Sequence, residues 1–207
     1  MKSYYFLRHG ESQGNYERVI QGQADLPLTD KGRNQAQCLA DYWSSNNSNF
    51  DLTISSPLMR AFETAKIIST RLNVTIQLDP DLMERSFGIL EGINGDQVLA
   101  QFPKIDYFHP YNFPFDGAET VIDLYIRACK VLKNLVDLPD GKYLIVSHGA
   151  FLNMVAYAIL GITPQGHRGS PLFLFGNTSF MEWKYDPEIS RWYFISFGNP
   201  CQVLSPE

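Results

Sequence analysis

The sequence predicts an α/β fold, a three-layer α/β/α sandwich with a mostly parallel mixed sheet and an irregular lid insertion. Short apolar runs of strand length alternate with longer helical patterns along most of the chain. This alternation is typical of a parallel sheet with helices on both faces. The C-terminal part differs, because Ser179–Tyr185 and Arg191–Phe197 alternate in polarity and flank Asp186–Ser190. That pattern predicts a hairpin, which makes the sheet mixed.

The first elements are indicated by apolar runs and a capping residue. Ser3–Leu7 is a short apolar run that ends in a polar turn, so we expect a buried strand there. Arg8–Leu28 contains three glycines and is expected to be a long loop. Thr29 can cap a helix that runs to about Ser45, and Asp51–Ser55 is expected to be the second strand.

The next helix has its own start signal. Ser56 followed by Pro57 has the form of a cap and a first-turn proline, and the helical spacing behind them ends near Arg71. Val74–Leu78 is expected to be the third strand.

The middle of the chain is less regular. Asp79–Gly117 is rich in Pro, Gly and aromatic residues, so we expect irregular structure with one short helix near Asp96–Phe102. Regular elements then resume, with a helix over Ala118–Val136. The fourth strand is expected at Lys142–Ser147, with a helix over Ala150–Leu160 packed behind it.

Length and composition narrow the class of protein. A chain of 207 residues suits one domain over residues 1–207, with a lid insertion at about 85–117. Hydrophobic residues make up 44% and charged residues 19%, which excludes a disordered chain. The net charge is −5, whereas nucleic-acid-binding domains are usually basic, so we expect no nucleic-acid partner.

Cysteine usage and hydropathy predict a cytoplasmic protein. Cys38, Cys129 and Cys201 are odd in number and form no CxxC motif, which fits a reducing cytosol and argues against a disulfide framework or a zinc cluster. Tyr4–Leu7 is too short for the core of a signal peptide. Tyr143–Gly161 is apolar but contains polar side chains, so it predicts a buried strand and helix rather than a membrane span.

Two strands are followed by the same kind of residue. Arg8, His9 and Gly10 come directly after the first strand, and His148 and Gly149 follow the fourth. If these strands are parallel neighbours, both histidines leave the sheet at its carboxyl edge, where open α/β sheets bind ligands. Either histidine alone is explained by a hydrogen bond at a strand end. The matched placement of the pair favours a functional site.

The second strand is expected to end at the same edge, and Arg60 comes shortly after it. It lies in the first turn of the helix that follows the second strand. A helix N-terminus attracts anions, and a guanidinium group matches the geometry of a phosphate. The alternative is a solvated surface arginine. Two arginines and two histidines without a carboxylate cluster predict a pocket for a phosphoryl group rather than for a metal ion.

The ordered motifs of the chain resemble those of the histidine phosphatase (phosphoglycerate mutase-like) superfamily. They span residues 4 to about 160, and such a set is far more specific than a lone Arg-His-Gly. The matching blocks are Leu7-Arg8-His9-Gly10-Glu11-Ser12, Asn15, Gln21-Gly22, Asp25, Pro27-Leu28-Thr29, Gly32, Gln35-Ala36, Ser55-Ser56-Pro57-Leu58, Arg60-Ala61, Glu63-Thr64-Ala65, Leu82, Glu84, Phe87-Gly88, Glu91-Gly92, Gly117, Glu119 and Val146-Ser147-His148-Gly149. The C-terminal hairpin matches no motif.

The resemblance implies a role for each matched residue. His9 is expected to be the nucleophile that forms a phosphohistidine, and Glu84 the proton donor to the leaving oxygen. Residues expected to bind the phosphoryl group are Arg8, Arg60 and His148, assisted by Asn15, with Gln21, Gly22 and Gly149 around them.

This chemistry is reasonable in itself, because a neutral imidazole is a good nucleophile and nearby cations lower the pKa of a histidine. Glu84 is singled out only by the pattern Leu82-x-Glu84-x-x-Phe87-Gly88, and its rivals are Glu11, Glu63 and Glu91.

The sequence favours a phosphatase over a mutase. Mutases of this family follow the acidic residue with Arg-His-Tyr-Gly, whereas here Glu84 is followed by Arg-Ser-Phe-Gly. Gly92–Gly117 contains Lys104 as its one fixed cation, too few for a second acidic group. Its aromatic side chains either line an apolar substrate pocket or merely pack the loop onto the sheet. They are Phe102, Tyr107, Phe108, Tyr111, Phe113 and Phe115.

We therefore expect a phosphomonoester hydrolase that uses a phosphohistidine and acts on a small phosphorylated metabolite. The alternatives are a cofactor-dependent phosphoglycerate mutase and a catalytically silent phosphate-binding module. No metal or cofactor is expected, since metal-ligand spacings such as H-E-x-x-H are missing. The expected partner is a small-molecule phosphomonoester, with no membrane. A homodimer through the C-terminal hairpin is left open.

Overall fold

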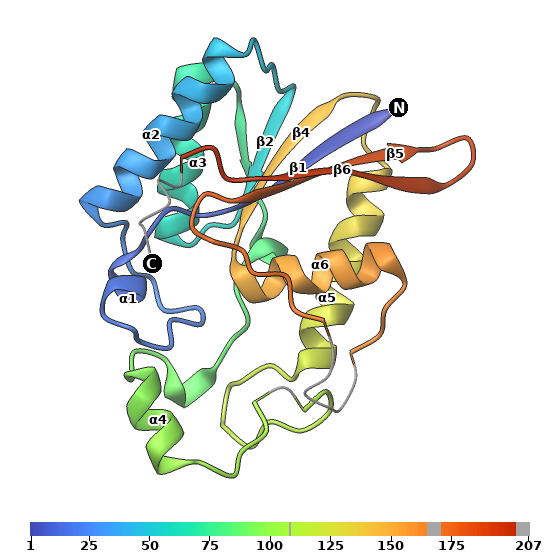
Figure 1. Cartoon of the computed structure of the whole chain (residues 1–207). Helices are drawn as coiled ribbons and strands as arrows, with labels where there is room; N and C mark the ends of the chain where they lie inside the picture. Colours follow the sequence, from blue (N-terminus) through green and yellow to red (C-terminus); the bar gives the residue numbers. More distant parts are fainter. Residues whose placement is uncertain (108, 165–170, 202–207) are drawn as a thin grey trace.

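A computed structural model describes residues 1–107, 109–164 and 171–201 of the chain. Its centre is a six-stranded mixed sheet with the order β3-β2-β4-β1-β5-β6 (Figure 1). The β3-β2, β2-β4 and β4-β1 pairs are parallel, and the hairpin adds two antiparallel pairs. The strands are β1 (Lys2–Arg8), β2 (Leu52–Ser55), β3 (Ile76–Leu78), β4 (Lys142–Ser147), β5 (Phe180–Asp186) and β6 (Arg191–Gly198).

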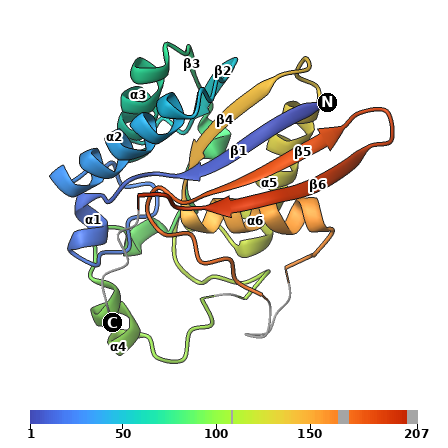
Figure 2. The same ribbon diagram turned by 45° about the horizontal axis from the view of Figure 1, so that its top comes forward.

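Helices cover both faces of this sheet (Figures 1 and 2). α2 (Asp30–Ser45) and α3 (Met59–Leu72) pack on one face, while α5 (Val121–Val136) and α6 (Gly149–Leu160) pack on the other. Side chains of β1 alternate between the two cores, with Phe6 in one and Leu7 in the other. A strand buried on both faces explains the continuous apolar run seen in the sequence. The predicted α/β/α sandwich is confirmed.

Capping residues set the ends of the main helices. Thr29 accepts a hydrogen bond from the N–H of Gly32 at the start of α2, as expected. Thr120 forms a capping box with Asp123 at the start of α5, three residues after the predicted start. Gly161 ends α6 in the left-handed conformation that glycine adopts without strain.

Two local expectations differ from the structure. The loop after β1 contains a short helix, α1 (Gln13–Tyr16), which begins with a capping box between Ser12 and Asn15. The pattern Ser56-Pro57 does not cap α3, which begins at Met59 without a side-chain cap. The hydroxyl of Ser56 instead lies 2.8 Å from His148 Nε2, so tertiary structure uses it elsewhere.

The segment 85–117 lies beyond the carboxyl ends of the parallel strands (Figure 1). The 3-10 helix η1 (Pro80–Leu82) leads toward it, and it contains η2 (Gly88–Leu90) and α4 (Gly95–Gln101). The short helix expected near Asp96–Phe102 is therefore confirmed. Leu90 and Val98 form the centre of a separate small core in this segment.

The expectation of reduced cysteines is wrong in one respect. A disulfide joins Cys38 of α2 to Cys201, across 163 residues of sequence. An odd number of cysteines argues against a disulfide framework. The sequence also contains no signal that the chain returns to α2 after the hairpin. Cys129 is free. Among the described helices, none is both long and apolar enough to cross a membrane.

Candidate active site

The two strand ends that carry histidines lie side by side. β1 and β4 are parallel neighbours whose register pairs Arg8 with Ser147, so His9 and His148 leave the sheet at the same edge. The centroids of the two imidazole rings are 5.1 Å apart. Both side chains are buried, with exposed fractions of 2% and 0%. The expected meeting of the histidines at the carboxyl edge is confirmed.

Hydrogen bonds fix the tautomer of His9 and the loop behind it. Nδ1 lies 2.7 Å from the carbonyl oxygen of Gly10, and a carbonyl can only accept. Nδ1 therefore carries the proton, and Nε2 is the basic nitrogen of the neutral ring. The N–H of Gly10 donates to Thr64 Oγ1 at 3.0 Å. A Cβ at Gly10 would lie 2.5 Å from the carbonyl oxygen of Gly32, so only glycine allows this approach to α2.

His148 has a defined tautomer as well. Its Nε2 lies 2.8 Å from Ser56 Oγ, which already accepts a hydrogen bond from the N–H of Leu58. When the hydroxyl proton is donated to Nε2, the ring proton lies on Nδ1. Within the described part of the chain this buried Nδ1 has no hydrogen-bond partner, so it can donate to an anion.

A buried arginine, Arg60, and a half-buried one, Arg8, approach the histidines. Arg60 is 1% exposed, and its Nη1 and Nη2 donate to the carbonyl oxygens of Ala24 at 2.8 Å and Gly22 at 2.7 Å. Arg8 donates through Nη1 to the carbonyl oxygen of Phe175. These bonds orient both guanidinium groups. The Nε atoms of both arginines are buried without a partner among the described residues, and they can also donate to an anion.

The electrostatics keep both histidines neutral. Burial, together with the positive charges of Arg8 and Arg60, holds the pKa of His9 well below its ordinary value. Burial and the same two cations lower the pKa of His148, and His9 contributes to that shift. Burial also lowers the pKa of each arginine, while the nearby carboxylate of Glu84 opposes this change.

Glu84 lies at the N-terminus of α6. Its carboxylate accepts hydrogen bonds from the N–H groups of Phe151 at 3.0 Å and Ala150 at 3.2 Å. A helix N-terminus stabilises a negative charge, so this position holds the carboxylate in place. The backbone of Glu84 is fixed by Arg127, whose Nη2 donates to its carbonyl oxygen at 3.1 Å.

The rivals of Glu84 are engaged elsewhere. Glu11 pairs with Lys31 and Glu63 with Arg33. Glu91 accepts hydrogen bonds from the backbone of Gln23 and Phe87 and thereby supports the loops around the site. Of these four glutamates, Glu84 is the one whose side chain lines the cleft together with Arg8.

Of the other expected phosphate-binding residues, some lie at the site and one supports a neighbouring loop. Gly22 lies at the site, since its carbonyl orients Arg60 and a Cβ there would lie 2.2 Å from the carboxylate of Glu91. Gly149 begins α6 beside Arg8. Gln21 supports the loop instead, because its Oε1 lies 2.7 Å from Ser12 Oγ.

Asn15 is linked to the backbone of His9 by a residue that the sequence did not single out. Asn177 Nδ2 donates to the backbone carbonyl of His9 at 3.1 Å and to Asn15 Oδ1 at 3.2 Å. Asn177 precedes the hairpin in a segment without a recognisable motif, so no sequence signal indicates it. Thr64 and Arg127 were also missed, although Thr64 lies inside one of the motif blocks.

The aromatic residues of segment 85–117 pack against one another. Phe113 is 7% exposed and contacts the rings of Phe87, Tyr107 and Phe115 at centroid distances of 5.8, 5.8 and 5.1 Å. The structure therefore favours loop packing over pocket lining for these rings. Phe108 lies outside the described residues.

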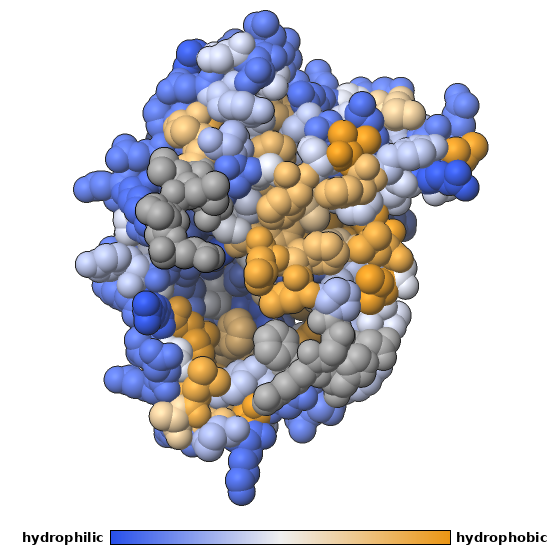
Figure 3. All heavy atoms as spheres, viewed as in Figure 1, coloured by the Kyte–Doolittle hydropathy of each residue, from blue (hydrophilic) through white to orange (hydrophobic). Residues whose placement is uncertain are grey.

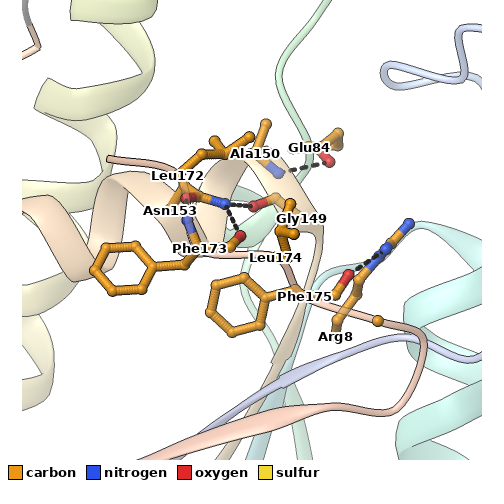
Figure 4. Close-up of a pocket in the computed structure, with 10 residues that line it drawn as sticks. Arg8, Glu84, Gly149, Ala150, Asn153, Leu172, Phe173, Leu174 and Phe175 are labelled. Atoms are coloured by element: carbon orange, nitrogen blue, oxygen red, sulfur yellow. Dashed lines mark hydrogen bonds between the residues drawn. The ribbon is translucent and has the colours of Figure 1, made fainter. Parts of the chain in front are cut away.

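An open cleft of about 580 Å³ adjoins the buried group (Figure 4). Its wall includes Arg8 and Glu84, followed by Ala150, Leu172 and Leu174. The site thus has a polar inner part around the histidines and an outer part with an apolar wall. Arg8 and Glu84 lie at the boundary.

Comparison with known proteins matches this arrangement to a family. The family model of the histidine phosphatase superfamily (branch 1) matches residues 4–197. The chain belongs to the histidine phosphatase superfamily.

Its curated relatives in this superfamily carry a mutase name. A probable phosphoglycerate mutase GpmB from Escherichia fergusonii is 37% identical over 81% of this chain and 79% of the relative. One from Yersinia pestis is 34% identical over 100% of this chain and 97% of the relative.

Solved structures similar to this chain carry phosphatase names. A mutant phosphoserine phosphatase from Entamoeba histolytica in complex with phosphoserine has a TM-score of 0.76 and 27% identity, covering 99% of this chain and 100% of the other. A mycobacterial glucosyl-3-phosphoglycerate phosphatase in complex with VO3 has a TM-score of 0.80, 24% identity and coverage of 95% and 98%, which shows the shared fold.

We expect the stability of the folded chain to fall in mild acid. An unfolded histidine binds a proton below about pH 6.5, whereas folded His9 and His148 resist it. The unfolded state then holds more protons, so the free energy of unfolding decreases by up to about 1.4 kcal/mol per pH unit for each histidine. The loss levels off once the pH falls through the folded pKa values.

Urea denaturation at about pH 7.5 and about pH 5.5 measures this loss. Replacing both buried histidines with asparagine should remove most of the difference between the two pH values. His109→Asn is the matched control, since His109 lies in segment 85–117, where its Nδ1 accepts hydrogen bonds from the backbone. An equal pH dependence in the double variant and the wild type would contradict the expectation.

Proposed function

We propose that this chain is a phosphomonoester hydrolase that works through a phosphohistidine on His9. One observation carries the proposal. A neutral imidazole with a basic Nε2 lies in a buried group with two arginines, and a carboxylate lies at the mouth of that group. The family supplies the general chemistry, and the unpaired donors around His9 are of the kind that a phosphoryl group requires.

The first half of the reaction forms a covalent intermediate. Nε2 of His9 attacks phosphorus, and the bond between phosphorus and the ester oxygen breaks. Glu84, in its acid form, gives a proton to the leaving oxygen, which departs as an alcohol. Arg8, Arg60 and His148 donate hydrogen bonds to the phosphoryl oxygens and stabilise their charge in the transition state.

The second half releases phosphate. The carboxylate of Glu84 takes a proton from a water molecule, whose oxygen attacks phosphorus as the bond to Nε2 breaks. His9 regains its basic nitrogen, and Glu84 regains its proton. The protein thus returns to its starting state, and no metal ion enters either step.

The charges of the site favour hydrolysis over isomerisation. Retention of a phosphoglycerate needs cations for its carboxylate beyond those that bind the phosphoryl group. Arg85 is 4% exposed and already donates to the carbonyl oxygens of Glu119 and Tyr107. Its guanidinium carbon lies 4.5 Å from the centroid of the Phe113 ring, which places it among packed aromatic side chains. Its Nε and Nη1 are used by these carbonyl oxygens, and its Nη2 is buried without a partner among the described residues.

The phosphoglycerate mutase remains the second candidate, since the curated relatives bear that name. A panel of phosphorylated metabolites assayed for phosphate release, beside 3-phosphoglycerate isomerisation with a bisphosphoglycerate primer, separates the two. We expect hydrolysis of an aryl phosphate to exceed isomerisation about a hundredfold or more. Both activities are measured with and without a chelator, and hydrolysis should persist in its presence.

Three other outcomes have distinct meanings. Efficient primer-dependent isomerisation with negligible hydrolysis would establish the mutase. Phosphate binding by calorimetry without turnover would establish the silent binding module. Loss of hydrolysis in chelator, restored by a divalent ion, would contradict the metal-independent mechanism.

A further inference from the structure

The wall of the outer cleft exposes two leucines. Residues 171–176 run in an irregular extended segment, where side chains alternate between inside and outside. Phe173 and Phe175 pack against the core beneath α6, whereas Leu172 is 58% exposed and Leu174 is 81% exposed. Leu174 has the highest exposed fraction of the large hydrophobic residues in the described ranges. Figure 3 shows apolar residues gathered over this region and the adjoining hairpin.

Hydrogen bonds hold these leucines in place. Asn153 of α6 is 5% exposed, and its side chain exchanges two bonds with the backbone of Phe173, at 2.8 and 3.0 Å. Its Nδ2 also donates to the carbonyl oxygen of Gly149 at 2.9 Å. Two residues further along, the carbonyl oxygen of Phe175 accepts from Arg8. The segment is thus tied to α6 and to the phosphoryl-binding arginine, as Figure 4 shows.

The described lining of the cleft contains few charged side chains. Among its described lining residues, Arg8 is the single cation and Glu84 the single anion. Arg8 is directed to the phosphoryl group in the proposed function, so it is not available to a second anion. The polar atoms of Asn153 already have partners. Among the described lining residues, a carboxylate or a second phosphate would lose its hydration without gaining a second cation as partner.

We propose that Leu172, Leu174 and Ala150 form a subsite for the alcohol half of the substrate, which selects uncharged, apolar phosphomonoesters. The inference rests on the proposed function, since Glu84 places the leaving oxygen at the mouth of the cleft. The substituent on that oxygen then extends along the two leucines. They are exposed in this structure and are covered when such a substituent binds.

A series of straight-chain alkyl phosphates tests the subsite. Their leaving groups have nearly constant basicity, so chain length changes only the apolar contact. We expect kcat/KM to rise by up to about fourfold with each added methylene over the first few carbons. Leu172→Ser and Leu174→Ser should flatten this rise, with about a five- to tenfold loss for the longer esters and little change for ethyl phosphate.

Two further variants sharpen the test. Ile189→Ser is the matched control, because Ile189 is also 58% exposed but lies in the hairpin turn away from the cleft. Leu174→Lys should raise kcat/KM for a phosphoester that bears a carboxylate, relative to an alkyl phosphate of similar size. Thermal melts check that each variant folds, which we expect because the replaced side chains are exposed.

The results separate the subsite from the proposed function. A flat dependence on chain length in an active wild-type enzyme would overturn the subsite and leave the hydrolase intact. The same profile in wild type and both serine variants would do so too. A wild-type protein that hydrolyses neither para-nitrophenyl phosphate nor any alkyl phosphate would overturn the proposed function, and the subsite with it.

Discussion

His9→Ala is expected to lower phosphate release by at least about a thousandfold, because no other group can form the covalent intermediate. The ring of His148 is 5.1 Å away, but its Nε2 is held by Ser56 and its Nδ1 carries the proton. It therefore cannot replace the nucleophile. Rapid quench with a radiolabelled phosphomonoester should trap an acid-labile, base-stable phosphoenzyme in the wild type and none in the variant.

His109→Ala is the control for general effects of removing an imidazole, and it should retain both label and turnover. The His9→Ala variant should still bind inorganic phosphate, since Arg8, Arg60 and His148 are unchanged. Substantial turnover by His9→Ala would rule out the phosphohistidine mechanism. A label that survives acid but is lost in base would point to an acyl phosphate on a carboxylate instead.

Glu84→Gln is expected to slow the hydrolysis of alkyl phosphates by about a hundred- to ten-thousandfold. Glutamine keeps an oxygen that can accept from the N–H of Phe151 and removes the transferable proton, while its amide nitrogen cannot accept from the N–H of Ala150. An alkoxide is a poor leaving group without that proton, whereas para-nitrophenolate leaves readily. The variant should therefore release one nitrophenolate per site in a fast burst.

The burst should be followed by very slow turnover, because the second step also needs Glu84 to deprotonate water. Phosphoenzyme should accumulate with para-nitrophenyl phosphate and not with butyl phosphate. Glu188→Gln, at an exposed turn, is the control and should behave as the wild type. A variant whose steady-state rates fall equally on both esters without a burst would show that Glu84 acts by position or charge alone.

The parts of the site that the sequence could predict are those carried by strand ends. A buried parallel strand must end at the carboxyl edge, so the placement of His9 and His148 follows from two apolar runs. Arg60 follows from the second strand in the same way, although its helix begins later than expected. These residues depend on chain direction and burial, which hydrophobic patterns indicate.

The parts of the site that the sequence could not predict depend on contacts between distant segments of the chain. Ser56 looks like a helix cap, but tertiary structure pairs it with His148. Asn177 joins the loops of His9 and Asn15 from 160 residues or more away. The leucines of the cleft wall lie in a segment without periodicity, while the conspicuous aromatic residues near Phe113 turned out to form a small core of their own. Such pairings follow from the folded chain and leave no local signal.

The position of β1 in the sheet has a consequence for how the protein is made. β1 is translated more than 130 residues before both of its partners in the sheet, β4 and β5. At a synthesis rate of about 5–20 residues per second, the apolar side chains of β1 have no partner strand for roughly 7–30 s. The segments between them can begin to fold, but His9 meets His148 only after β4 has left the ribosome. The site is therefore completed late, because a chain truncated before β4 carries His9 and the two arginines but lacks His148 and the strand beside β1.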